Sequence, residues 1–202
     1  GTPGSLTFIT GACASTTLNA TGLTAGITYY IRAYTLSAVV TTFSAFNICV
    51  GTTPLPPGND MCSGAITVPP AGPFPYLSPS SDNTSATNTN DPTNTCQANS
   101  NAGVWYSFTP NVTGSYIISS CQSDAPLSAI SDNVLSVFSS TTGCTGPFAQ
   151  VACDDDGCTT LSLQGYLTTS LTAGTQYYIL IYGYNTNRGN IQLSVAQANP
   201  PP

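Results

Sequence analysis

Short runs of alternating hydrophobic and polar residues occur along most of the chain, separated by turns rich in Gly, Pro and Asn. Alternation with a period of two is typical of a β-strand that buries one face. Long segments with the period of an amphipathic helix are missing. The pattern therefore predicts an all-β protein built as a β-sandwich. Strands are expected at residues 6–10, 16–21, 28–35, 45–50, 65–68, 104–109, 115–120, 134–139, 150–152, 165–169, 176–184 and 190–196.

One of these hydrophobic segments occurs twice. LTAGITYYIRAY at residues 23–34 returns as LTAGTQYYILIY at residues 171–182, and each copy is followed by a polar turn, a closing strand and a Pro-rich stretch. The second copy comes late in a long domain, whereas the first begins at Leu23. A complete sandwich of this kind takes about 100 residues. Residues 1–53 are therefore expected to form a partial β-sandwich that a neighbouring protomer completes.

Changes in composition divide the rest of the chain. Residues 54–58 are a Pro-rich linker, which favours an extended and semi-rigid spacer. Residues 59–198 are expected to form a β-sandwich domain, and residues 199–202 a Pro-rich tail. Within that domain, residues 69–101 are rich in Pro, Ser, Asn and Thr, and predict a long surface excursion.

Alternation also assigns two faces to the repeated strand. Positions 29, 31 and 33 of the first copy, like positions 177, 179 and 181 of the second, are expected to face the core. The opposite face is rich in tyrosine. It either packs against a neighbouring protein or a glycan, or forms ordinary cross-strand aromatic pairs. The residues expected at an interface with a neighbouring protomer are Leu6, Phe8, Tyr30, Arg32 and Tyr34.

The charged residues restrict the possible functions. All acidic residues are Asp, the only basic residues are two Arg, and Lys, His and Glu are absent. The commonest groups of acid–base and nucleophilic catalysis are therefore missing, and we expect no enzymatic activity. The net charge of −6 disfavours nucleic acid as a partner, because phosphate binding needs Lys and Arg. No apolar run approaches the ~20 residues that cross a bilayer.

The chain has eight Cys and no His, which favours disulfides over a zinc site and predicts an oxidising, extracellular setting. Sequence alone does not choose among the many possible pairings. The domain division favours a bridge within residues 1–53 and three bridges beyond them. The expected pairs are Cys13 with Cys49, Cys62 with Cys96, Cys144 with Cys153, and Cys121 with Cys158.

A run of three acidic residues, Asp154, Asp155 and Asp156, stands in a chain that is almost without cations. Adjacent carboxylates repel one another, and Ca²⁺ relieves such repulsion by binding six to eight oxygen atoms. Asp132, on a neighbouring expected strand, is a further candidate ligand. The alternative is a solvated acidic turn fixed by flanking disulfides.

Three sites fit the pattern Asn-x-Ser/Thr of N-linked glycosylation: Asn19, Asn83 and Asn111. The segment 78–95, rich in Ser and Thr, is an alternative carrier of O-linked sugar.

Five motifs together carry a family resemblance. They are NDMCSGAI at residues 59–66, VWYSFTP at 104–110, DNVLSVF at 132–138, CDDDGC at 153–158 and LTAGTQYYI at 171–179. From residue 59 to about residue 196 the chain resembles the pre-peptidase C-terminal family of jelly-roll-like β-sandwiches, common in secreted and surface proteins of Bacteroidota-like bacteria. Gly103 stands where the family usually has Asp. Residues 1–53 match only the tail of the family pattern, and also resemble a fibronectin type III strand pair.

The resemblance implies a binding, spacer or accessory module rather than an active site. Together with the incomplete first domain, it favours a structural subunit of a bacterial extracellular fibre or repetitive surface protein. Copies would assemble head-to-tail by β-strand complementation. The alternative is a carbohydrate- or protein-binding accessory module of a secreted hydrolase or adhesin.

Overall fold

The computed structural model describes residues 20, 22–32, 54–159 and 163–198. The chain divides into two compact units, Gly1–Val50 and Gly51–Pro202. Every strand among the described residues lies in the second unit, together with two short 3-10 helices, Cys62–Gly64 and Gly143–Thr145. The prediction of an all-β fold is therefore confirmed.

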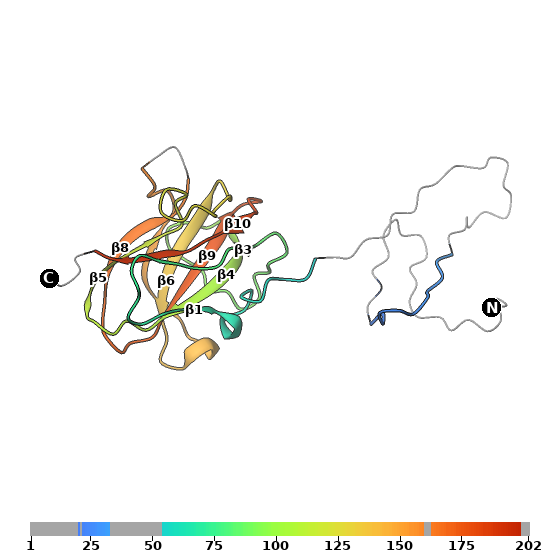
Figure 1. Cartoon of the computed structure of the whole chain (residues 1–202), viewed down its shortest axis with the longest axis horizontal. Coiled ribbons are helices and arrows are strands. Elements are labelled where there is room, and N and C mark those ends of the chain that lie inside the picture. The colour runs from blue at the N-terminus through green and yellow to red at the C-terminus, as the bar shows by residue number, and fades with distance from the viewer. Residues whose placement is uncertain (1–19, 21, 33–53, 160–162, 199–202) are drawn as a thin grey trace. The chain divides into compact units, whose positions relative to one another are not determined.

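The second unit is a sandwich of two sheets (Figure 1). The larger sheet has the strand order β1-β4-β9-β6-β7 and the smaller one β2-β11-β5-β8, while β10 and β3 form a separate pair. β1 runs parallel to β4, and the other paired strands are antiparallel. The strands are β1 (Ile66–Val68), β2 (Tyr76–Leu77), β3 (Ser81–Asp82), β4 (Ser100–Phe108), β5 (Gly114–Ser119), β6 (Asn133–Ser139), β7 (Ala149–Asp154), β8 (Tyr166–Leu171), β9 (Tyr177–Tyr184), β10 (Asn190–Ile191) and β11 (Ser194–Gln197).

The main core lies between the two sheets. Tyr177, Ile179 and Ile181 of β9 face it, as their alternation predicted, and they pack in the same cluster as Tyr116 and Ile118 of β5. The side chains of a strand point alternately to the two faces of its sheet, so one strand supplies every second residue to this core. Pattern reading therefore assigned the inner face of β9 correctly.

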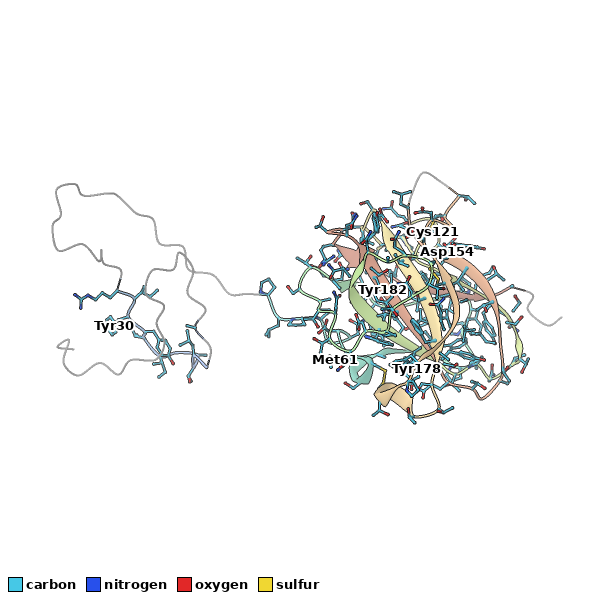
Figure 2. All side chains as sticks on the ribbon, turned by 180° about the vertical axis from the view of Figure 1, so that it is seen from behind. Tyr30, Met61, Cys121, Asp154, Tyr178 and Tyr182 are labelled. Carbon is cyan, nitrogen blue, oxygen red and sulfur yellow. A yellow bond between two sulfur atoms is a disulfide. The ribbon has the colours of Figure 1, made fainter. Side chains whose placement is uncertain are left out.

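The other face of β9 is also buried, which decides between the two interpretations of this tyrosine-rich face in the second unit. Tyr178, Leu180 and Tyr182 belong to a second hydrophobic cluster with Trp105, against which Phe148 packs. The Tyr182 hydroxyl donates a hydrogen bond to the Pro92 carbonyl of the chain's own excursion. Cross-strand aromatic packing, the alternative reading, describes this face, and Figure 2 shows Tyr178 and Tyr182 within the sandwich.

Residues 69–101 lie mostly at the surface, as predicted, but short strands and hydrogen bonds tie them to the sandwich. They contribute β2 and β3, and the Ser78 amide donates to the Leu193 carbonyl at 2.9 Å. The Ser78 hydroxyl in turn accepts from the Leu193 amide at 2.9 Å. These bonds hold the excursion against the last strands, and they divide the single strand expected at 190–196 into β10 and β11.

Three disulfides cross-link the second unit: Cys62–Cys144, Cys96–Cys153 and Cys121–Cys158. The last agrees with the prediction. The expected pairs Cys62–Cys96 and Cys144–Cys153 are wrong, because the fold brings together cysteines that are far apart in sequence. Gln150 of β7 accepts a hydrogen bond from the Thr95 amide at 2.9 Å, and this contact brings the strand beside Cys96. Cys13 and Cys49 lie outside the described residues.

Candidate functional site

Three of the acidic residues lie together at one end of the larger sheet. Asp132 directly precedes β6, and Asp155 and Asp156 directly follow β7, which pairs with β6. One carboxylate oxygen from each residue lies within 4.8 Å of those of the other two. Three of the four predicted metal ligands therefore meet in the folded chain, although Asp132 is far from the others in sequence.

Asp154, the fourth predicted ligand, has a structural role instead. Its Oδ2 accepts hydrogen bonds from the amides of Gly157 and Tyr166, at 2.7 and 2.9 Å. A Cβ at position 157 would lie 2.4 Å from Asp154 Oδ2, so the close approach of this turn requires glycine. Asp154 thus fixes the turn after β7 against the start of β8 and stands apart from the cluster. In Figure 2 Asp154 lies well away from Tyr178, which is nearer the other end of the sandwich.

Two members of the cluster, Asp132 and Asp155, have raised pKa values. Burial raises the pKa of Asp132, and the negative charges of Asp155 and Asp156 raise it further. Burial also raises the pKa of Asp155, with a further rise from Asp156 and Asp154, while the hydrogen bond from Gln97 acts in the opposite direction. Gln97 Nε2 donates to Asp155 Oδ2 at 2.8 Å. The sequence did not predict this contact, because Gln97 and Asp155 are far apart along the chain. The neighbouring Cys96–Cys153 bridge brings the two segments together.

A second candidate site is the turn of the repeated segment, which has the same form in both units. In the first unit the Thr24 amide donates to the Tyr29 hydroxyl at 2.9 Å, and Gly26 has a φ of 81°. In the second unit the Thr172 amide donates to the Tyr177 hydroxyl at 3.0 Å, and Gly174 has a φ of 73°. Glycine adopts this left-handed conformation without steric cost, so both sequences encode one turn.

Beyond the turn the two copies differ. β9 is central in its sheet, and the segment of the second copy buries Leu171, Tyr178 and Ile179. In the first copy, residues 27–32 form no strand, which corrects the part of the strand expected at 28–35 that the structure describes. Tyr30 and Ile31, which match Tyr178 and Ile179, are 69% and 61% exposed. The repeated segment is therefore buried in the second unit and exposed to solvent in the first.

Of the remaining predicted interface residues, the structure describes only Arg32. Arg32 is exposed, like Tyr30. Leu6, Phe8 and Tyr34 lie outside the described residues, so their place at an interface stays a prediction.

Only two of the three candidate glycosylation sites fall within the described residues, and they differ in exposure. Asn111 is exposed and stays a candidate, while Asn19 is outside the described residues. Asn83 is fully buried, its Nδ2 donates to the Ala102 carbonyl at 3.1 Å, and its Oδ1 accepts from the Gly189 amide at 2.8 Å. Its side-chain amide is already engaged and has no room for a sugar, so the fold excludes Asn83 as a site.

No known family model and no curated protein matches the chain. The described residues also include no helix that is long and apolar enough to cross a membrane. The function must therefore be argued from the sites themselves.

Proposed function

We propose that the protein is a non-enzymatic structural subunit of an extracellular fibre or repetitive surface protein. In this proposal a second copy completes the first unit by donating a β-strand. The observation that carries the proposal is the contrast between the two copies of the repeated segment. β9 has partners on both edges, whereas residues 27–32 of the first unit belong to no sheet.

Physical chemistry favours a β-strand as the missing partner. Residues 27–32 alternate in the same way as β9, and an extended chain beside them would pair with their backbone groups. Ile27, Tyr30 and Ile31 are each more than half exposed. Burying each of these side chains would contribute about 1.5 to 3 kcal/mol. Leu6 and Phe8 lie two positions apart in the N-terminal segment, so both would face the same side of an extended chain. We propose these two residues for the interface beside residues 27–32.

Three further observations agree with this role. The three disulfides fit an oxidising environment of the kind found outside the cytosol. The chain lacks Lys, His and Glu, which are common in catalytic sites. The tyrosine face that would have served an accessory module as a glycan platform is buried in the second unit.

Electron microscopy and light scattering on the purified chain test the proposal. The intact chain is expected to form head-to-tail polymers, and deletion of residues 1–10 is expected to leave a soluble monomer. Ile31→Asp is expected to prevent assembly, because a charge in the new core would be buried without a partner. Leu127→Asp is the matched control, because Leu127 of the second unit is 56% exposed, close to the 61% of Ile31.

Two outcomes would contradict the proposal. One is an intact chain that stays monomeric while residues 22–32 are protected from hydrogen exchange. The other is an Ile31→Asp variant that assembles as well as the Leu127→Asp variant. Either result would favour the accessory-module function.

A further inference from the structure

Asp132, Asp155 and Asp156 differ from an ordinary acidic surface patch, because Asp132 and one carboxylate oxygen of Asp155 are buried. Asp132 is only 9% exposed, and among the described residues its carboxylate has no hydrogen-bond donor. Asp155 Oδ1 is likewise buried and without a hydrogen-bond partner. A buried carboxylate oxygen without a partner costs free energy, because it loses its hydration and gains nothing in return. These two groups point to a missing positive partner.

The described residues of the second unit supply no such charge. Arg188, the only basic residue of the second unit, directs its guanidinium to the carbonyls of Asn185 and Asn187. The chain has no Lys and no His. A cation from solution would fill this place.

The chain holds the cluster in place from both sides. The acidic run lies between Cys153, bridged to Cys96, and Cys158, bridged to Cys121. Asp154 fixes the turn between them, and Gln97 fixes one oxygen of Asp155, which leaves the other available. Asn133 anchors the residue beside Asp132, because its Oδ1 accepts from Ser120 Oγ at 2.7 Å and from the Gly165 amide at 3.1 Å. Binding of a ligand would therefore require little further ordering of these side chains.

We propose that Asp132, Asp155 and Asp156 bind one Ca²⁺ ion. The three groups offer only oxygen, which hard cations prefer. Oxygens on opposite sides of an ion lie twice the metal–oxygen distance apart, about 4.8 Å for Ca²⁺ and about 4.2 Å for Mg²⁺. The three oxygens lie within 4.8 Å of one another, which does not exceed the span of one Ca²⁺ ion. With one oxygen of Asp155 bonded to Gln97, the three carboxylates offer up to five oxygens, and the exposed Asp156 leaves one side open to water.

Isothermal titration of the intact chain with CaCl₂ tests the inference. One saturable ion per chain is expected, with a dissociation constant of about 10⁻⁴ M, typical of extracellular calcium sites. Calcium is expected to raise the melting temperature, and a chelator to reverse the rise, because a ligand that binds only the folded state stabilises it. Asp132→Asn and Asp155→Asn are expected to weaken binding at least tenfold.

Asp82→Asn is the matched control, because it removes the same charge from an exposed residue of β3 and should leave calcium binding unchanged. Asp156→Asn serves as a second test that does not disturb a buried position, and it is also expected to weaken binding. If NaCl or MgCl₂ raises the melting temperature as much as CaCl₂, or if Asp82→Asn weakens the response as much as Asp155→Asn, the cluster is only an acidic turn and the inference fails. The test does not depend on assembly.

Discussion

Single residues acquire their roles from neighbours that the sequence does not show. Asp154, Asp155 and Asp156 have the same chemistry in sequence, and only the fold separates one that fixes a turn from two that face Asp132. Gly103 is a similar case. A Cβ there would lie 2.6 Å from Asp91 Oδ2 and 2.6 Å from Leu180 Cδ1. A side chain at position 103 would therefore collide with the carboxylate of Asp91, so this position requires glycine.

Asp91 is expected to make the protein less stable as the pH rises. Burial raises the pKa of Asp91 to about 7, although the hydrogen bond from Trp105 Nε1, 3.0 Å long, lowers it. A raised pKa means that the folded state favours the protonated form. The stabilisation is therefore complete below pH ~4 and is lost as the pH rises through about 7.

Chemical denaturation at pH 4.5 and pH 8 measures this effect. The free energy of unfolding should fall by on the order of 2 kcal/mol more in the parent protein than in Asp91→Asn, after allowance for partial solvent access. Equal falls in the two proteins would show that Asp91 is not the group responsible.

Asp154→Ala is expected to destabilise the second unit by about 2 to 4 kcal/mol, because two backbone amides lose a charged acceptor. Asp156→Ala, which removes an exposed carboxylate next along the run, should cost less than about 0.5 kcal/mol without calcium. Thermal unfolding in the presence of a chelator compares the two variants. Similar losses would mean that Asp154 does not hold the turn.

Elements were predictable where their own sequence defines them. β4, β5, β6 and β9 have long hydrophobic alternation, and each was found close to its expected residues. β2 and β3 have two residues each and no pattern of their own. They form because Ser78 and Asn83 bond to residues more than a hundred positions later in the chain. Pattern reading cannot detect a strand that is defined by its partner.

Asn83→Ala is expected to cost about 2 to 4 kcal/mol of stability, because the buried Ala102 carbonyl and the Gly189 amide would both lose their partner. Through these two hydrogen bonds, Asn83 connects the segment after β3 with β4 and with the residue that precedes β10. Asn111→Ala, at the exposed candidate site, should change stability little. Denaturant unfolding of both variants tests the contrast, and equal losses would remove the structural role of Asn83.

At the scale of the whole molecule, assembly should change the first unit and leave the second unit as it is. In chains kept monomeric by Ile31→Asp, amides of residues 27–32 are expected to exchange rapidly with solvent, because they lie in no sheet. In polymers of the parent chain the same amides should become protected. β9 gives an internal control, since its central position should protect it in both states. Protection of residues 27–32 that does not differ between the two states would contradict strand donation.

The order of the three disulfides has a consequence for how the protein is made. Along the second unit the six bridged cysteines run 62, 96, 121, 144, 153, 158, and each of the first three joins the cysteine three places later, so all three bridges interleave. Of these six, Cys62 and Cys96 emerge first, and they form the non-native pair that was expected from the sequence. Correct oxidative folding must delay or undo that bond. Refolding of the reduced protein should therefore succeed with a thiol–disulfide exchange buffer or a disulfide isomerase, and give scrambled products with an oxidant alone.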